Sequence, residues 1–383
     1  MKIAIIQNVP INDHRMVHID GIAKELIRRG YRVDVIIHES NKEPQFNALP
    51  YNVTYIPGDI YSILGQLKFI YGLFTLLKKR KYDIIHAKNP FSSILPALIN
   101  KSEAKVIYDV RGLWIDFGIH AGNVSNKAAY FLKKIDMFCM EKADRVIAIS
   151  KELKNILVIR GLEEDKIDVV IGDGVDLETA RILDKKDIRD FLKIEGKIIG
   201  YVGGIGRSRY SDRIIEAFEI VHREINSAKL VMIGPCREVE YFKKLVNKLG
   251  FDDYVFFTGF IPHDEALQFM KSFDVSVSYH ESDLPIFNVA VPTKILEYLA
   301  NGCSIVTTDQ TMYKNLLTHE KDAYLTGQDP KSFAQGIIRV LQDDELSKRL
   351  SKNALITAEK LSFEKVTDKI EKIYESIRYV YNG

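Results

Sequence analysis

The sequence is poor in cysteine and has no large excess of charge. Its three cysteines, Cys139, Cys236 and Cys303, lie far apart among 383 residues. They form neither a disulfide framework nor a metal-ligand spacing, which is typical of a reducing compartment. A formal net charge of +2 leaves no strongly basic footprint for nucleic acid. No apolar run reaches the roughly 18–20 residues that cross a bilayer, and we interpret residues 1–6 as a first strand rather than a signal peptide.

Two nucleotide-binding signatures are also missing. The glycine-rich stretch 201–210 lacks Gly-Lys-Ser/Thr, which excludes a P-loop there. Gly203, Gly204 and Gly206 do not have the Gly-x-Gly-x-x-Gly spacing, and no acidic residue ends the next strand, where Gly234 stands. A dinucleotide-dependent oxidoreductase is therefore a distant interpretation.

The sequence contains, instead, short apolar runs that alternate with helical periodicity. Runs such as 82–86, 105–109 and 229–234 are continuously apolar, which predicts parallel strands covered on both faces. The alternation occurs in both halves of the chain. We therefore predict an α/β protein of two doubly wound domains, with a ligand crevice at the carboxyl ends of the strands.

The length of the chain also favours two domains, because a single core rarely grows beyond about 250–300 residues. We place the boundary near the charged run 184–189. The expected domains are 1–185 and 186–359. A C-terminal helix at about 360–383 completes the prediction.

The stretch 292–302 suits a ligand with a phosphate and a ribose. It begins with a proline suited to a first helical turn, ends on Asn-Gly, and places Lys294 and Glu297 three residues apart on one helical face. Helix-terminal amides bind phosphate, and a carboxylate accepts from sugar hydroxyls. A surface helix with a solvated Lys-Glu pair is the alternative.

The stretch 201–210 is a second candidate. Glycines after a parallel strand allow a close approach of the backbone to a ligand. Arg207 and Arg209 supply positive charge for a diphosphate. The alternative is a glycine-rich connection with solvated arginines.

These stretches resemble the nucleotide-sugar domain of family 4 glycosyltransferases, in a branch with a Pro-x-Lys-x-x-Glu-Tyr helix. Further similar segments are 214–218, 231–234, 257–260, 28–33, 82–87 and 143–150. The resemblance runs in order through nearly the whole chain. It implies a GT-B fold of two Rossmann-like domains, with a last helix that crosses back to the first. It also implies retaining transfer of a sugar from a nucleoside diphosphate, in a chain that needs no metal or other cofactor; no Asp-x-Asp pair is present.

The resemblance assigns roles by matched position. Glu297 matches the carboxylate that holds the donor ribose, and Arg209 aligns with a lysine that meets the diphosphate. Arg207 is a second candidate for that catalytic role. The other donor-binding positions are Gly203, Gly204, Gly234, Lys294, Phe260 and Ile261, the last two beside the base.

The sequence departs from the family pattern in front of this helix. The family often has a first glutamate eight positions before the second, and Val289 stands there. Asp283, Glu281 or Asn288 are possible substitutes, as are backbone amides between 285 and 291. The usual acceptor-side histidine is also absent, and the segment around Asp109 and Arg111 occupies its place.

Polar residues at predicted strand ends of the first half are the acceptor-side candidates. Each has a capping or solvated-loop role as its alternative. They are Asp13, His14, Arg15, His86, Lys88 and Asp109, with Arg111 as a catalytic candidate.

Residues 60–81 carry an apolar helical stripe with a basic end. The stripe is Ile60, Ile63, Leu64, Leu67, Ile70, Tyr71, Phe74 and Leu77, and Phe69, Leu73 and Leu76 widen it. Such a helix either lies on an anionic membrane surface or packs with its basic end against the helix dipole.

We therefore predict a cytoplasmic hexosyltransferase for cell-surface glycan synthesis. Association with the inner face of the membrane is an alternative location. Its partners would be a nucleoside diphosphate sugar and a glycan or lipid-linked acceptor. A nucleotide-sugar epimerase of the same fold and a non-catalytic nucleotide-sugar-binding subunit are the alternatives.

Overall fold

The computed structural model divides the chain into two compact units. The first unit is Met1–Gly174 with Phe363–Gly383, and the second is Val175–Ser362. The described residues are 1–11, 13, 15–39, 49–60, 62–100, 103–120, 122–281, 288–314 and 316–379. None of the helices in these ranges is both long and apolar enough to span a membrane.

The division lies before the charged run at which we expected it. Ile188 of that run is fully buried in the core of the second unit. Asp187 caps helix α8 (Ile188–Leu192), and Arg189 pairs with Asp274. The charges therefore start a packed helix rather than form a linker, because a cap and an ion pair satisfy them locally.

The first unit contains a seven-stranded parallel sheet in the order β3-β2-β1-β4-β5-β6-β7. The strands are β1 (Lys2–Ile6), β2 (Arg32–His38), β3 (Asn52–Ile56), β4 (Ile84–Lys88), β5 (Lys105–Val110), β6 (Arg145–Ala148) and β7 (Ile167–Val169). The order reverses between β1 and β4, so a crevice at the carboxyl edge is expected beside these two strands.

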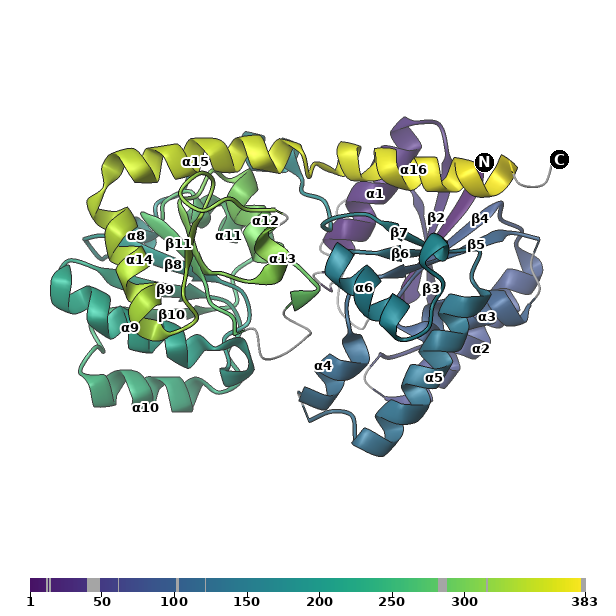
Figure 1. Cartoon of the computed structure of the whole chain (residues 1–383), viewed down its shortest axis with the longest axis horizontal. Helices are drawn as coiled ribbons and strands as arrows, with labels where there is room; N and C mark the ends of the chain where they lie inside the picture. The colour runs from purple at the N-terminus through teal and green to yellow at the C-terminus, as the bar shows by residue number, and fades with distance from the viewer. Residues whose placement is uncertain are drawn as a thin grey trace. The chain divides into compact units, whose positions relative to one another are not determined.

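Helices cover both faces of this sheet, as continuous apolar strands require. They are α1 (Met16–Arg28), α2 (Ile63–Lys79), α3 (Leu95–Ile99), α4 (Trp114–His120), α5 (Asn126–Lys142), α6 (Lys151–Ile159) and α16 (Phe363–Tyr379). Figure 1 shows α1 and α16 on one side of the sheet and α2, α3 and α5 on the other. Serines cap α2, α5 and α6; the Ser150 hydroxyl at the start of α6 accepts from the Leu153 amide at 3.0 Å.

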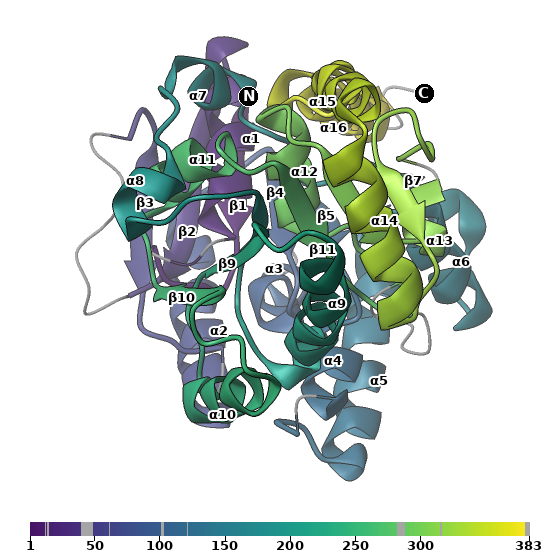
Figure 2. The ribbon, with the colours of Figure 1, turned by 90° about the vertical axis from the view of Figure 1, so that its left-hand side faces the viewer.

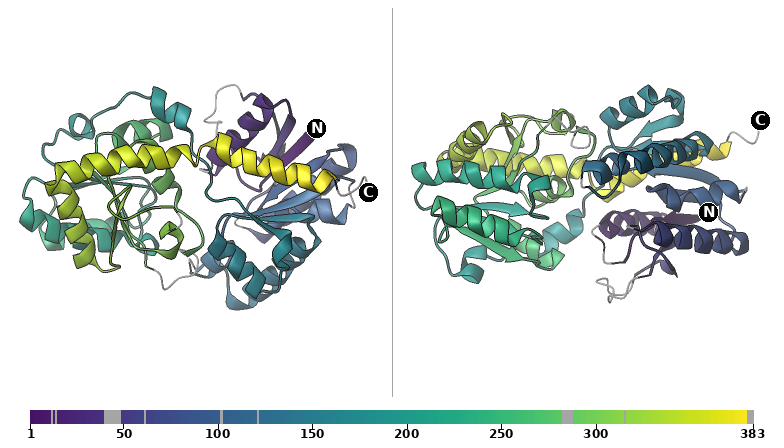
Figure 3. Two further views of the ribbon diagram at one scale, coloured as in Figure 1. Left: turned by 45° about the horizontal axis from the view of Figure 1, so that its top comes forward. Right: turned by 90° about the horizontal axis from the view of Figure 1, so that it is seen from below.

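The C-terminal helix α16 belongs to the core of the first unit, as the resemblance implied. Its buried stripe packs on α1 and on the first sheet, and Figure 3 shows the helix against this unit in two views. The stripe is Phe363, Val366, Ile370, Ile373, Tyr374 and Ile377. A Cβ on Gly21 or Gly174 would lie within 2.4 Å of the Phe363 ring. The absence of two side chains therefore makes room for the first residue of the helix.

Helix α2 buries a narrower face than the sequence suggested. Phe69, Leu73 and Leu77 are buried, whereas Ile63 and Tyr71 are 82% and 72% exposed. The wide apolar pattern is thus two faces on one helix, one packed on the unit and one open.

The second unit contains a six-stranded parallel sheet in the order β10-β9-β8-β11-β12-β13. The strands are β8 (Ile198–Val202), β9 (Lys229–Ile233), β10 (Val255–Gly259), β11 (Val275–Ser278), β12 (Ile305–Thr308) and β13 (Tyr324–Thr326). Helices surround it: α7 (Leu177–Ile182), α8, α9 (Ser211–Glu224), α10 (Val239–Leu249), α11 (His263–Met270), α12 (Thr293–Ala300), α13 (Thr311–Lys314), α14 (Pro330–Gln342) and α15 (Asp344–Glu359). Figure 2 shows α9 beside α14, and both contribute to one core with the sheet. The strand order reverses between β8 and β11, which places the expected crevice beside the ends of these strands.

Candidate functional site

A glycine stands at the carboxyl end of three neighbouring strands of the second sheet: Gly203 follows β8, Gly234 follows β9 and Gly259 is the last residue of β10. The Gly203 amide donates to Ile233 O at 2.8 Å, and the Gly234 amide donates to Gly259 O at 2.9 Å. A Cβ on Gly234 would lie 2.1 Å from Gly203 O, and Gly234 has a φ of +140°, so only glycine fits. A Cβ on Gly204 would meet nothing within 4 Å. The backbone at the end of β8 is therefore open to a ligand.

Lys294, in the first turn of α12, places an ammonium group beside these glycines. Its Nζ lies 3.6 Å from the centroid of the Tyr201 ring and 3.1 Å from a Cβ built on Gly203. It has no carboxylate partner among the residues that the structure describes. Burial, followed by the positive charge of Arg209, holds the pKa of Lys294 well below its usual range. A bound anion would relieve this penalty.

The two arginines of the glycine loop point to different surroundings. The charge of Arg209 acts on Lys294. Burial lowers the pKa of His280, and the charges of Lys294 and Arg209 lower it further, to about 3. Arg207 is 63% exposed and is held by Glu238, with Nε 2.6 Å from Oε1. Arg207 is therefore engaged in an ion pair with Glu238, whereas the charge of Arg209 acts at Lys294.

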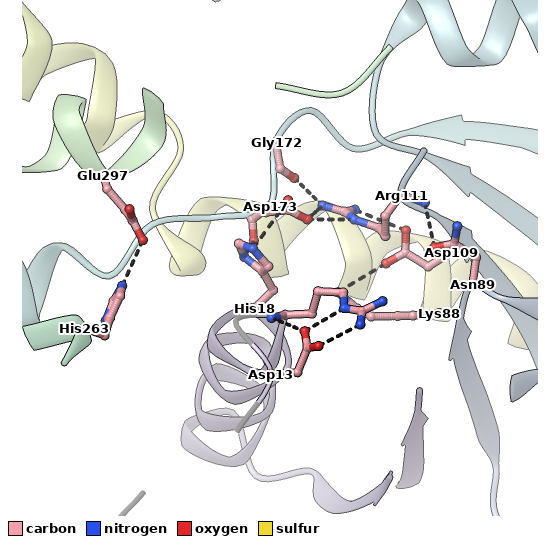
Figure 4. Close-up of polar contacts among 11 residues, drawn as sticks. Asp13, His18, Lys88, Asn89, Asp109, Arg111, Gly172, Asp173, His263 and Glu297 are labelled. Atoms are coloured by element: carbon pink, nitrogen blue, oxygen red, sulfur yellow. Dashed lines mark hydrogen bonds and ion pairs between the residues drawn. The ribbon is translucent and has the colours of Figure 1, made fainter. Parts of the chain in front are cut away.

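Glu297 projects from α12 on the same face as Lys294. Its Oε1 lies 2.9 Å from Nε2 of His263, the first residue of α11, as Figure 4 shows. Burial would lower the pKa of His263, but the hydrogen bond and charge of Glu297 outweigh it, so the pKa is raised. His263 directly follows the segment 260–262, so the expected base and ribose positions adjoin.

The remaining donor-side candidates are placed unequally. Phe260 is exposed, whereas Ile261 packs against the core. Val289 is fully buried, so its side chain cannot meet a sugar. Asn288 lies in the same described turn. Asp283 lies outside the described residues.

The carboxyl edge of the first sheet carries a buried charge cluster, also drawn in Figure 4. Arg111 donates from Nη1 to Asp109 Oδ1 at 3.1 Å and from Nε to Asp173 Oδ1 at 2.8 Å. Lys88 Nζ lies 3.7 Å from Asp109 Oδ2, and His18 Nε2 lies 3.4 Å from Asp173 Oδ2. Two cations thus face two carboxylates. Despite burial, the Arg111 and Lys88 charges hold the pKa of Asp109 far below its usual range.

Two acceptor-side predictions meet a physical obstacle in this cluster. Asp109 is 0% exposed, and His86 is fully buried between Asp109 at 3.1 Å and the Tyr374 hydroxyl at 2.7 Å. A side chain enclosed in this way supports Arg111 and Lys88 instead of contacting an acceptor. Lys88 is itself only 2% exposed.

Asp13 and Arg15 follow β1 at the same edge. Arg15 donates to both carboxylate oxygens of Asp13, at 2.6 and 2.7 Å, in a bidentate pair. His14 lies outside the described residues. The structure therefore brings Asp13 and Arg15 together, but each is already satisfied by the other.

Sequence reasoning missed two contributors to these sites. Asp173 is not among the predicted site residues, although it follows the seventh strand and so shares the carboxyl edge with Asp109. His263 was not considered, although it adjoins the expected base-flanking segment. Their positions after β7 and after residues 260–262 were the available signals.

A metal site does not emerge from the described ranges: no group of three or more His, Cys, Asp or Glu side chains there could hold an ion.

Comparison with known proteins places both halves in one enzyme class. Residues 17–179 match the family described as "Glycosyltransferase Family 4", and residues 184–356 match "Glycosyl transferases group 1". The chain is 23% identical over 375 residues to the capsular polysaccharide biosynthesis glycosyltransferase CapM of Staphylococcus aureus, with 93% of each chain covered. It is 25% identical over 303 residues to the UDP-Gal:alpha-D-GlcNAc-diphosphoundecaprenol alpha-1,3-galactosyltransferase of Escherichia coli, covering 76% of this chain and 74% of that one.

Solved structures agree on the fold. Anabaena HepE in complex with UDP and glucose superposes with a TM-score of 0.78 at 18% identity, covering 98% of this chain and 100% of that one. WaaG, a glycosyltransferase of lipopolysaccharide biosynthesis, gives a TM-score of 0.71 at 13% identity over 100% of both chains. The predicted fold class and transferase activity are therefore confirmed, and the chain is a GT-B glycosyltransferase of the family 4 type.

Proposed function

We propose that the enzyme moves a hexose from a UDP-linked donor to a glycan or lipid-linked acceptor in cell-surface glycan synthesis, with retention of the anomeric configuration. The observation that carries the donor assignment is the ammonium of Lys294, which stands beside the open backbone of Gly203 and Gly204 without a carboxylate partner among the described residues. UDP and a glycan acceptor are supported by the ligands named for HepE and the substrates named for the E. coli relative.

In this proposal the diphosphate rests on the glycine backbone between Lys294 and Arg209. No side chain of the N-cap residue Pro292 accepts from the first amides of α12, so we assign these amides to the same anion. The leaving diphosphate gains charge as the glycosidic bond breaks, and fixed cations stabilise that charge more than the ground state. The protein's own cations supply this stabilisation, so we expect no metal requirement; loss of turnover in EDTA, restored by a divalent ion, would contradict it.

Glu297 takes the ribose and the segment at Phe260 and Ile261 takes the base. On the acceptor side, Arg111 is the better candidate, because its side chain is 11% exposed, whereas that of Lys88 is only 2% exposed. Glu281, Asp283, Asn288 and the backbone amides between 285 and 291 stay predictions for the group that replaces the first family glutamate, since Val289 at that position is buried.

The test is titration of the protein with UDP-glucose, UDP-galactose and their GDP counterparts by calorimetry, followed by product analysis with lipid-linked acceptor extracts. We expect micromolar binding of a UDP-sugar and transfer with the donor's anomeric configuration, read from the anomeric proton coupling. Absence of binding to every donor would reject the proposal, and conversion without any acceptor would indicate an epimerase.

The open face of α2 supports contact with an anionic membrane. Ile63, Leu64, Leu67 and Tyr71 are exposed, and Lys78, Lys79 and Arg80 follow at the end of the helix. Helix α5 carries a similar face with Tyr130, Phe131, Ile135 and Phe138 exposed. Apolar side chains enter the headgroup boundary while lysines meet lipid phosphates.

Vesicle flotation tests this contact. Replacement of Lys78, Lys79 and Arg80 by Gln should reduce flotation with phosphatidylglycerol vesicles. The matched control is Lys243, Lys244 and Lys248 to Gln on exposed positions of α10. Equal flotation of the two triple variants would reject the electrostatic contribution of α2.

A further inference from the structure

The pair formed by His263 and Glu297 has an asymmetry that bears on donor binding. Oε1 of Glu297 lies 2.9 Å from His263 Nε2, whereas Oε2 makes no hydrogen bond or ion pair with any residue that the structure describes. Glu297 is mostly buried, and its backbone carbonyl accepts from Asn301 in the next turn. One carboxylate oxygen is therefore held inside the protein and the other remains for a ligand.

We propose that His263 is a positioning residue for the donor: it fixes Glu297 through Oε1 so that Oε2 accepts from the ribose hydroxyls. This inference rests on the ribose role proposed above for Glu297. The glutamate has three rotatable side-chain bonds, and ordering them on binding weakens affinity unless a neighbour orders them beforehand. A histidine that joins two helices, α11 and α12, supplies that order.

The charged surroundings of His263 favour its protonated form. Glu297 faces it from α12, Asp264 Oδ1 lies 3.8 Å from its Nδ1 on its own helix, and Asp176, the cap of α7, adds negative charge. A protonated imidazole must donate through Nε2. A neutral imidazole can place its proton on Nδ1 instead, toward Asp264, and then presents a lone pair to Glu297.

The experiment compares UDP with 2′-deoxy-UDP, because the pair differs only in one ribose hydroxyl. Dissociation constants are measured by calorimetry for the full chain at pH 6.5. In the wild type, UDP should bind about tenfold tighter, as expected for a hydrogen bond to a carboxylate. Glu297→Ala should abolish this preference, so that the two nucleotides bind about equally.

His263→Ala should reduce the preference to about threefold, and His263→Gln should restore it, because the Gln amide nitrogen reaches the place of the imidazole Nε2. His263→Ala should have no further effect in the Glu297→Ala background, since the histidine acts through the glutamate. His319→Ala, at an exposed histidine of the same unit, is the control and should leave the preference unchanged.

The wild-type preference should also fall as pH rises through the raised pKa of His263, whereas that of His263→Gln should stay flat. An unchanged preference in His263→Ala, with loss in Glu297→Ala, would overturn the positioning role alone. An unchanged preference in Glu297→Ala would instead overturn the ribose role on which it rests. Thermal melting of each variant separates these results from loss of folding.

Discussion

The carboxyl edges of the two sheets differ in how their cations are compensated by carboxylates. At the first sheet, Lys88 and Arg111 face Asp109 and Asp173 inside the unit. At the second, Lys294 and Arg209 lie near the glycine-rich end of β8, and the Glu297 carboxylate is engaged by His263. The same position in a doubly wound sheet thus holds paired charges in one unit, and in the other it holds the anion site that we propose.

The comparison separates stability from affinity. A buried pair that loses one partner leaves an uncompensated charge, which costs stability. The Lys294 ammonium, which has no carboxylate partner among the described residues, already lowers the stability of the empty protein. A bound anion would offset this desolvation cost. Substitutions at the two edges should therefore move different measurements.

The largest effect is expected at the first edge. Asp109→Asn should destabilise the protein by about 3–5 kcal/mol, since Lys88 and Arg111 would lose a buried carboxylate. Urea unfolding measures it. The control Glu345→Gln, in an exposed pair with Lys348, should cost less than about 1 kcal/mol. Similar costs for both would remove the distinction between the clusters.

At the second edge, Lys294→Met should lower UDP-sugar affinity about 30- to 100-fold, because a charge-assisted contact to the diphosphate is lost. The same change should raise the free energy of unfolding slightly, since an unpaired, desolvated ammonium is removed. Calorimetry and thermal melting give the two values. Lys248→Met on exposed α10 should change neither, and a clear loss of stability in Lys294→Met would contradict an unpaired cation.

The depressed pKa of Lys294 predicts proton uptake on donor binding. A diphosphate beside the ammonium raises that pKa, so affinity should fall as pH rises above the pKa of the empty site. Binding enthalpies measured in buffers of different ionisation enthalpy should differ in wild type and agree in Lys294→Met. No buffer dependence in the wild type would rule out the coupling.

Acid should weaken the first edge specifically. Burial opposes ionisation of Asp173, but Arg111 and His18 lower its pKa to about 2, below its unfolded value. Its stabilising effect is thus present above about pH 4 and is lost as pH falls toward 2, by about 2 kcal/mol. Unfolding curves between pH 2 and 5 should be flatter for Asp173→Asn, and identical slopes would contradict the assignment.

The smallest effect is expected from Arg207→Gln. Its guanidinium is exposed and paired with Glu238, so donor affinity should change less than about twofold. Arg209→Gln, the matched change two residues on, should cost about tenfold. A loss in Arg207→Gln equal to that in Arg209→Gln would restore the first arginine to the donor site.

The sequence predicted the architecture because continuous apolar strands and helix caps are local signals. It predicted Lys294 and Glu297 on one face because helical spacing fixes that relation. It could not predict that Arg207 turns to Glu238, since the two lie 31 residues apart and meet only through the fold. Nor could it predict that Asp109 is enclosed, because enclosure requires Arg111, Asp173 and the distant α16 together.

Because α16 belongs to the first unit, the order of synthesis affects when that unit can be completed. Its core side chains emerge from the ribosome only after the 188 residues of Val175–Ser362. At about 5–20 residues per second that interval is on the order of ten seconds or more. During it, the apolar surface of α1 that later packs against α16 is uncovered, while the second unit has all of its own strands and helices. The unit made first is therefore completed last, and this apolar surface is the one that a chaperone would need to shield on the nascent chain.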